Sequence, residues 1–425
     1  MSTTEAGPAS VGQRQLWLMD HYLGAGGALN CPIILRISGD LDRDRLADAL
    51  EQVIARHEAL RTTFTGRGRW LARKVAAPFA IELPVVDLTD SADPEAAVIE
   101  ALRAELATRF DVTEQTLRAR LWRLGPRTHV LCLNQHHLIT DAWSCGIVSR
   151  ELGQSYSGRD LPEVSAAFSD FVRAETEELS GDRLARLQEY WRTQLDGLSV
   201  PRLPERDPNR TRSIAFARTR LSRQTRAGIT TTARAHRTTP FAVLLGAFMS
   251  VLHAHTRQRD LAVASLLANR APGAMDTTVG YLANMVLLRV RFPQARSTGE
   301  VVEAARKTVV GALVHQALPY QMLPLNTIRA QAVRDVVFQV FAEATHQTTL
   351  GASDLTVEPV DPPAGMGARF DLDFVVMPHR DGGFEVVVGY ASDRFEDAWV
   401  RGFVDRFAAV AAGLAESPSG TMLPG

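Results

Sequence analysis

The sequence predicts a mixed α/β protein made of two domain-sized parts. Its 425 residues suffice for two or three domains. Helical and extended patterns both occur in the first half, and both return after a proline-containing stretch at residues 196–211. We therefore expect an N-terminal part at residues 1–178 and a C-terminal part at 179–425, which includes the linker 196–211. No period of about 20 to 50 residues repeats, so a solenoid or propeller is not expected.

The first half contains a helix and a pair of strands. Four aliphatic side chains recur at helical spacing between charged residues: Leu46, Leu50, Val53 and Leu60. This pattern predicts an amphipathic helix over residues 42–60. His57 lies on the same face, which favours a core or structural role over a chemical one. Two strands are expected at 117–124 and 129–137, on either side of turn residues 125–128.

The second half repeats the mixture of helix and strand. A buried helix is expected to begin at Pro240, where the missing N–H of proline costs nothing. Alternating apolar residues predict a strand at 336–340. Residues 371–377 and 384–391 flank a glycine-containing turn and predict a hairpin. A stripe of aromatic and aliphatic residues at 399–414 predicts a last amphipathic helix.

Composition excludes several functional classes. The chain has 47 Lys and Arg against 48 Asp and Glu, so its net charge of −1 argues against nonspecific nucleic-acid binding. The longest apolar stretch, residues 241–252, is too short to cross a bilayer of about 30 Å. The start of the chain does not resemble a secretory signal. Three cysteines without metal-like spacing, Cys31, Cys132 and Cys145, argue against a disulfide framework. We therefore expect a cytoplasmic protein with no membrane or nucleic-acid partner.

The densest polar cluster in an apolar stretch is His136-His137-Leu-Ile-Thr-Asp141-Ala-Trp-Ser144, at the end of the strand 129–137. Neighbouring side chains of an extended backbone point to opposite faces, so His136 and His137 cannot both face one cavity. A histidine with a pKa of about 6.5 can accept a proton from an amine or hydroxyl. Asp141 can order the site directly or pair with an arginine. Two core histidines are the plainer interpretation, but the polar residues at this spacing favour catalysis.

Other chemistries fit less well. No serine lies in a Gly-x-Ser-x-Gly turn, and neither Cys132 nor Cys145 has an activating context, so covalent catalysis is the weaker interpretation. The adjacent histidines diverge, and no His-Glu-x-x-His stretch occurs, so we expect no metal site.

The polar cluster resembles the His-His-x-x-x-Asp-Gly-x-Ser signature of nonribosomal peptide synthetase condensation domains, which are relatives of chloramphenicol acetyltransferase. Further stretches resemble that family and follow in family order: 10–17 (SVGQRQLW), 56–64 (RHEALRTTF), 168–171 (FSDF), 279–284 (VGYLAN) with 287–289, 315–320 (HQALPY), 334–340 (RDVVFQV), 369–372 (RFDL) and 390–395 (YASDRF). The resemblance implies an α/β fold of two acetyltransferase-like lobes in a V, with a central tunnel that contains the histidine motif.

The resemblance also implies roles for the residues of the motif. His137 would be the catalytic residue, which positions or deprotonates the nucleophile, and His136 would be structural. Asp141 would organise the site through a buried ion pair with an arginine. We favour Arg270 over Arg61 as that arginine, and removal of either partner would leave a costly buried charge.

Five further residues are candidates around the motif. The backbone N–H groups near Ala142 and Trp143 are possible donors to an oxyanion. Ala142 stands where the family has glycine, and a positive φ there would cost alanine about 1 kcal/mol. Ser144 is expected to hydrogen-bond within the loop, with binding of the pantetheine arm as the alternative. Tyr281 is a candidate tunnel residue, and Asn284 would contact substrate or, equally plausibly, satisfy backbone groups.

We therefore expect a free-standing condensation enzyme of nonribosomal peptide, antibiotic or related natural-product biosynthesis. It would form an amide or ester from an acyl or aminoacyl thioester that a donor carrier protein brings in trans on phosphopantetheine. The acceptor would be bound to a second carrier protein or would be a small soluble amine or alcohol. The enzyme itself would bind no cofactor, and no adenylation, carrier or thioesterase segment is expected within the 425 residues.

Several alternatives remain beside this function. A coenzyme-A-dependent acyltransferase of the same superfamily would use the same tunnel. A catalytically silent module that recruits another enzyme is disfavoured because both histidines and Asp141 are present. An epimerisation domain is disfavoured because no Glu-Gly-His-Gly-Arg-like stretch occurs near 264–270. A cyclisation domain is excluded by His136 and His137.

Overall fold

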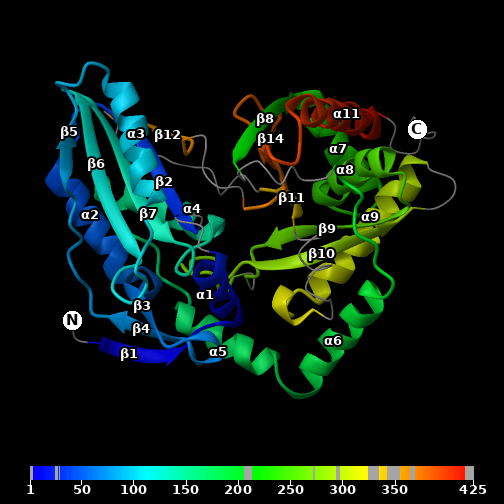
Figure 1. Ribbon diagram of the computed structural model, residues 1–425, viewed down its shortest axis with the longest axis horizontal. Helices are drawn as coiled ribbons and strands as arrows, with labels where there is room; N and C mark the ends of the chain where they lie inside the picture. Colours follow the sequence, from blue (N-terminus) through cyan, green and yellow to red (C-terminus); the bar gives the residue numbers. More distant parts are fainter. Residues whose placement is uncertain are drawn as a thin grey trace. The chain divides into compact units, whose positions relative to one another are not determined.

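The computed structural model describes residues 3–23, 27, 29–204, 213–270, 273–292, 297–323, 335–341, 355–363 and 369–416 (Figure 1). The chain forms two compact units. Unit 1 contains Met1–Glu178, Ala268–Ala283 and Ala344–Met366, and unit 2 contains Leu179–Leu267, Asn284–Glu343 and Gly367–Gly425. The division expected from the sequence, 1–178 and 179–425, differs because it left the two later segments out of the first unit. Part of the expected linker 196–211 lies outside the described residues.

Both units combine helices with sheets, which confirms the mixed α/β class. The main sheet of unit 1 has five strands in the order β12-β2-β7-β6-β5: Thr356–Pro359, Asn30–Ser38, Thr128–His136, Leu117–Gly125 and Val85–Asp87. Strands β6 and β7 are the pair that the sequence predicts, joined by a tight turn. Central strand β7 is antiparallel to both of its neighbours and is buried from Val130 onward. Its last residue is His136, so the histidine motif begins where the central strand ends.

Within its described residues, unit 1 also contains a small sheet and five α-helices. The small sheet has the order β1-β4-β3: Thr3–Pro8, Ala72–Ala76 and Thr62–Thr65. The helices are α1 (Val11–Leu23), α2 (Arg43–Arg56), α3 (Pro94–Ala107), α4 (Ala142–Tyr156) and α5 (Phe168–Glu178). Helix α2 buries the predicted aliphatic stripe and packs on α4. It is shorter than expected, because His57 has an extended backbone and residues Glu58–Arg61 form a separate 3-10 turn.

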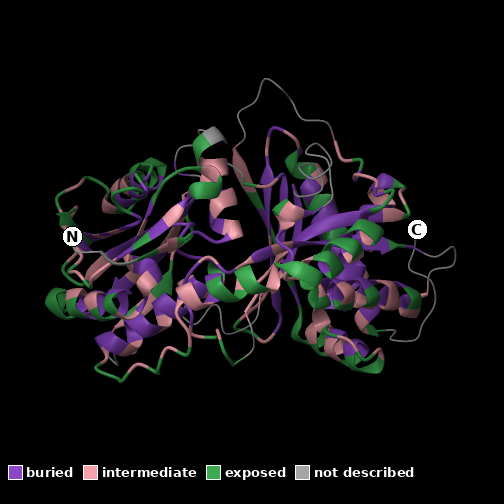
Figure 2. Ribbon diagram, turned by 90° about the horizontal axis from the view of Figure 1, so that it is seen from below, coloured by how far each residue is buried: buried purple, intermediate pink, exposed green. Residues whose placement is uncertain are grey.

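Unit 2 is built on a six-stranded sheet in the order β10-β9-β11-β13-β14-β8: Asn284–Arg291, Asp260–Leu267, Val336–Val340, Leu372–Pro378, Phe384–Ala391 and Ile214–Leu221. Strands β13 and β14 form the hairpin that the sequence predicts. The unit also contains α6 (Gly181–Leu195), α7 (Arg223–Ala235), α8 (Pro240–Thr256), α9 (Thr298–Val314) and α11 (Asp397–Glu416). The central strands of the two larger sheets, such as β7, β9 and β11, are largely buried, whereas many helices combine buried and exposed faces (Figure 2).

Helix α8 is apolar almost all round because it is buried on nearly every side. It begins at Pro240, and the Thr239 side chain caps it by accepting a hydrogen bond from the Ala242 N–H. Its Phe248 ring packs on Phe338, Phe374 and Phe403 in the core of unit 2. Within the described residues no single helix meets the length and hydropathy needed to span a membrane; α7 and α8 meet them only as a pair that bends by 105°.

Candidate active site around the paired histidines

The chain turns sharply between β7 and α4, and this turn carries the histidine motif. The backbone N–H of His136 donates to the Thr116 carbonyl, and that of His137 donates to the Leu29 carbonyl at 2.8 Å. The N–H of Ile139 returns to the His136 carbonyl at 3.0 Å, which closes the turn. Asp141 then caps α4. These backbone hydrogen bonds therefore support the turn independently of its side-chain contacts.

The ring of His137 has a defined tautomer. Its Nδ1 lies 2.7 Å from the Thr140 carbonyl oxygen. A carbonyl oxygen only accepts hydrogen bonds, so Nδ1 carries the proton and Nε2 is the basic nitrogen of the neutral ring. Tyr281 packs edge-on against the ring at 5.1 Å between centroids. His137 is 7% exposed, so packing leaves a small part of the residue accessible.

His136 has the opposite tautomer. Its Nδ1 accepts a hydrogen bond of 3.1 Å from the Leu138 N–H, so the proton of the neutral ring lies on Nε2. Nε2 faces a carboxylate oxygen of Asp20 at 3.8 Å, and no described residue lies within hydrogen-bonding distance of it. Burial alone would raise the pKa of Asp20, but His136 and Arg109 outweigh burial and lower it. His136 is thus enclosed by its own turn and by Asp20.

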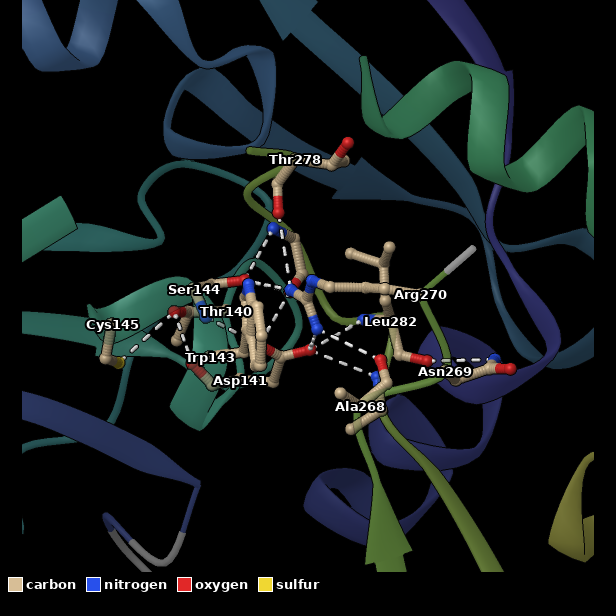
Figure 3. A network of polar contacts seen from close by, with 12 residues as sticks. Thr140, Asp141, Trp143, Ser144, Cys145, Ala268, Asn269, Arg270, Thr278 and Leu282 are labelled. Atoms are coloured by element: carbon tan, nitrogen blue, oxygen red, sulfur yellow. Dashed lines mark hydrogen bonds and ion pairs between the residues drawn. The ribbon is translucent and has the colours of Figure 1, made fainter. Parts of the chain in front are cut away.

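Asp141 is buried, and each of its two carboxylate oxygens accepts at least two hydrogen bonds. The Nη2 and Nη1 atoms of Arg270 donate to Oδ1 and Oδ2 at 3.0 and 3.1 Å (Figure 3). Oδ1 also accepts from the Ser144 N–H at 2.8 Å, and Oδ2 accepts from the N–H groups of Leu282 and Ala283, each at 3.1 Å. Burial favours a raised pKa for Asp141, but the guanidinium and these donors lower it. An ionised, fully occupied carboxylate is suited to organise the site and unsuited to accept a proton.

Arg270 belongs to the segment 268–283 and attaches that segment to the start of α4. Besides Asp141, it donates to the Ser144 hydroxyl at 2.8 Å and to the Ala268 carbonyl at 3.0 Å. Its guanidinium lies 5.6 Å from the Trp143 ring centroid, within the range of a cation–π contact (Figure 3). Arg61 instead donates to backbone carbonyls, including that of Ile54 at 3.1 Å. The structure therefore pairs Asp141 with Arg270.

The Ser144 hydroxyl makes its hydrogen bonds within the loop. It donates to the Gly280 carbonyl at 2.8 Å and accepts from the Gly280 N–H at 3.1 Å and from Arg270. Gly280 has φ 158°, and a Cβ there would lie 2.0 Å from a ring atom of Phe168. These contacts favour the loop interpretation of Ser144 over a role with the pantetheine arm. The neighbouring Trp143 ring N–H donates to the Asp276 carbonyl at 3.0 Å.

Ala142 is the first residue of α4 and does not have a positive φ. The strain anticipated for alanine at this position therefore does not arise. Asp141 accepts hydrogen bonds from the N–H groups of Ser144 and Cys145. The N–H groups of Ala142 and Trp143 belong to the first turn, where a helix supplies no acceptor and where its dipole favours negative charge.

Asn284 lies at the start of β10 in unit 2. Its amide donates to the carbonyls of Gln316 and Leu318 at 2.6 and 2.9 Å, and its carbonyl accepts from the Tyr320 N–H at 3.2 Å. The sequence allowed two roles for Asn284, contact with substrate or hydrogen bonding to backbone groups. These contacts favour the second role. Tyr281 belongs to unit 1 and contacts His137 directly.

Several side-chain contacts around the histidines were not predicted from the sequence, because the contacting residues come from distant parts of the chain. Asp20 faces His136, and Gln13 donates to the Leu138 carbonyl at 2.8 Å. Glu151, which is fully buried, contacts Nε2 of His57 at 2.8 Å, and His57 is therefore a buried structural residue. Only Gln13 had a sequence signal, because Ser10-x-x-Gln13 has capping-box spacing.

Cys132 and Cys145 are poorly suited to nucleophilic chemistry. Burial raises the pKa of Cys145 to about 12 and also raises the pKa of Cys132, so neither thiol readily forms a thiolate. Across the described residues, no group of three His, Cys, Asp or Glu side chains could hold a metal ion.

Comparisons with known proteins identify the family. The family model "Condensation domain" matches residues 4–422. Chondramide synthase cmdD of Chondromyces crocatus is 30% identical over 97% of this chain, and phosphinothricin tripeptide synthetase PhsC of Streptomyces viridochromogenes is 29% identical over 97% of it. The chain spans 11% of the length of the first relative and 39% of the second. Cyclosporin synthetase simA of Tolypocladium inflatum is 29% identical over 96% of this chain, which spans 3% of that protein.

Solved structures share the fold. SgcC5 of Streptomyces globisporus is 26% identical with a TM-score of 0.77, over 98% of this chain and 100% of that one. The condensation domain of the monacolin K polyketide synthase MokA is 22% identical with a TM-score of 0.82, over 99% of both chains, and supports the fold alone. The acetyltransferase-like fold class is thereby confirmed. The chain belongs to the condensation domain family, a family of acyltransferases that is found in nonribosomal peptide synthetases.

Proposed function

We propose that this chain transfers an acyl or aminoacyl group from the phosphopantetheine arm of a carrier protein to an amine or hydroxyl, and so forms an amide or ester. His137 is the catalytic residue. The observation that carries the proposal is the hydrogen bond of 2.7 Å between its Nδ1 and the Thr140 carbonyl, because it leaves Nε2 as the basic nitrogen. No cofactor of the enzyme itself enters the reaction.

A thioester is already activated, so the enzyme has to align two reactants and move one proton. As the nucleophile attacks the thioester carbonyl carbon, its proton passes to Nε2 of His137. The imidazolium is stabilised by the Thr140 carbonyl, which accepts from Nδ1. Collapse of the tetrahedral species breaks the carbon–sulfur bond, and the proton passes from Nε2 to the departing sulfur. The products are an amide or ester and the pantetheine thiol.

The tetrahedral species carries a negative oxygen that requires donors. The N–H groups of Ala142 and Trp143, at the first turn of α4, supply that donor pair in our proposal. Their direction is set by the Asp141 cap and by the Arg270 ion pair, which fixes the start of the helix. Asp141 and Arg270 therefore act as positioning residues, and His136 has a structural role in the turn.

We propose that the donor carrier protein acts in trans and that the acceptor is either carrier-bound or a small soluble molecule. SgcC5, which this chain matches over 100% of its length, was solved with (R)-(-)-1-(2-naphthyl)-1,2-ethanediol. Because that ligand carries hydroxyl groups, we include hydroxyl acceptors beside amines in the proposal.

The test is intact-protein mass spectrometry of carrier proteins loaded with acyl or aminoacyl groups. Each is mixed with the enzyme and with a set of amines, aryl ethanediols or a loaded acceptor carrier. We expect loss of the acyl mass from the donor and formation of the matching amide or ester. His137→Ala should reduce this transfer by about 100-fold or more, as expected for loss of a general base. His379→Ala, in the hairpin of unit 2, is the matched control and should leave transfer unchanged.

Other outcomes distinguish the alternatives. Transfer that survives His137→Ala would remove the assigned base. Transfer from acyl-coenzyme A but from no loaded carrier would identify a coenzyme-A-dependent acyltransferase. Binding of a loaded carrier without transfer to any acceptor would favour a recruitment module.

A further inference from the structure

One face of helix α1 carries two polar side chains that both reach the histidine turn. Gln13 and Asp20 are seven residues apart, which places them on the same face about two turns from each other. Gln13 contacts Leu138, and Asp20 faces His136. The two contacted residues flank His137 in the chain, so α1 holds the turn on both sides of the proposed catalytic residue.

Gln13 links the start of α1 to the turn. Its side-chain oxygen accepts from the Ser10 N–H at 3.0 Å, and its backbone N–H donates to the Ser10 hydroxyl at 3.0 Å, which together form a capping box. Its side-chain N–H donates to the Leu138 carbonyl at 2.8 Å. Gln13 and Ser10 are each 1% exposed, so water does not compete for these hydrogen bonds. One amide thus couples the helix cap to the turn.

Leu138 is held at both of its backbone groups. Its N–H donates to Nδ1 of His136, and its carbonyl accepts from Gln13. The peptide units on either side of Leu138 therefore have defined orientations, and the first of them begins at the carbonyl of His137. A rotation of the His137 backbone would turn the His137 ring away from the Thr140 carbonyl.

Asp20 acts at the other end of the same helix face. Its carboxylate faces the protonated Nε2 of His136 at 3.8 Å and contacts Arg109 at 3.3 Å. The carboxylate favours the tautomer with the proton on Nε2, and only that tautomer lets Nδ1 accept from Leu138. Gln13 and Asp20 therefore support the same backbone unit by different routes.

We propose that α1 is a positioning element for the catalytic histidine, with Gln13 and Asp20 as its positioning residues. The inference rests on the proposed function of His137. It predicts that a change at α1 alters the rate of the chemical step while the fold and the apparent substrate affinity are retained.

Gln13→Glu is the most selective variant. The glutamate retains an oxygen for the Ser10 N–H, so the capping box persists, but it replaces the donor to the Leu138 carbonyl by an acceptor. We expect kcat to fall about 10- to 100-fold, as for a small misplacement of a catalytic group, with KM within about twofold of wild type. Gln15→Glu makes the same chemical change on the same helix away from the contacting face, and kcat should be unchanged. Equal losses in both variants would overturn the proposal.

A second measurement does not depend on activity. In protein labelled with 15N-histidine, the ring nitrogens of His137 should report a proton on Nδ1 in wild type and in Gln15→Glu. In folded Gln13→Glu and Asp20→Asn we expect a mixture of tautomers at His137. An unchanged His137 tautomer together with wild-type kcat in both variants would refute positioning by α1. An altered tautomer in a protein without transferase activity would instead retain the positioning role and refute the proposed function.

Discussion

The two units each contain a buried arginine that binds an aspartate through two hydrogen bonds, yet the two pairs differ in the exposure of the carboxylate. In unit 1 the side chains of Arg270 and Asp141 are both 3% exposed. In unit 2 the Arg289 side chain is 2% exposed, whereas that of Asp260 is 34% exposed. Arg289 donates to Asp260 at 2.7 and 2.5 Å and also to the carbonyls of Gln194 and Asp196.

This difference in exposure determines how the negative charge of each carboxylate is stabilised. Water reaches Asp260, so part of its charge is solvated without Arg289. Asp141 is buried, so its charge depends on protein donors, and three of these are the backbone N–H groups of Ser144, Leu282 and Ala283. The unit 1 pair therefore joins the cap of α4 to the segment 268–283, while the unit 2 pair joins strands β9 and β10 to the end of α6. The same ion-pair chemistry supports a helix end beside the histidines in one unit and a sheet edge in the other.

The largest expected effect is loss of the arginine in unit 1. Arg270→Met should lower the free energy of unfolding by about 3–5 kcal/mol, because it leaves the Asp141 carboxylate buried without its counter-ion. Arg289→Met should cost about 1–3 kcal/mol, the range for lost hydrogen bonds, because Asp260 remains hydrated. Urea denaturation of both variants measures the two losses. Equal losses would show that carboxylate exposure does not distinguish the pairs.

A smaller effect is expected in the pH dependence of stability. Asp141 has a lowered pKa in the folded protein, so its contribution is complete above the unfolded value of about 3.9 and is lost as the pH falls through the folded value. Asp141→Asn should therefore be less stable than wild type at pH 7, and the gap should close as the solution is acidified.

Denaturation midpoints measured from neutral to acidic pH test this expectation. Asp260→Asn is the matched variant, and its loss at pH 7 should be smaller because water screens the exposed carboxylate. A gap between wild type and Asp141→Asn that stays constant down to the lowest pH would contradict the assignment of an ionised Asp141.

The smallest effect concerns the alanine that stands in place of the family's glycine. Because Ala142 is helical and lacks a positive φ, Ala142→Gly should not stabilise the protein and should cost up to about 1 kcal/mol. Ala96→Gly, in the first turn of α3, should show a loss of similar size. Thermal melts of both variants provide the measurement. A stabilised Ala142→Gly would indicate that this helix end is strained by alanine.

Much of the local structure could be predicted from short stretches of sequence. The helix at 43–56, the strands β6 and β7, the start of α8 and the hairpin of β13 and β14 all follow from side-chain periodicity or turn residues. The position of the histidine motif at a strand end was also predictable, because the apolar run Val130–Leu133 ends shortly before His136. These features depend on residues less than about twenty positions apart.

The contacts that define the site were not predictable in the same way. Arg270 is 129 residues from Asp141, Gln13 is 125 residues from Leu138, and strand β12 joins β2 across more than half of the chain. Nothing in local periodicity specifies which arginine reaches a buried aspartate, and the family resemblance rather than residue chemistry favoured Arg270. Asp20 carried no sequence signal, because an aspartate in the last turn of an amphipathic helix usually faces solvent.

The sequence by itself determined the classes of element, the place of the two histidines at the end of a strand and the family to which they belong. Only the tertiary structure decided the tautomers of His136 and His137, the saturation of Asp141 and the contact of α1 with the turn. The physical reason is that periodicity records which face of a segment is buried, whereas a hydrogen-bond partner is chosen when distant segments are packed together.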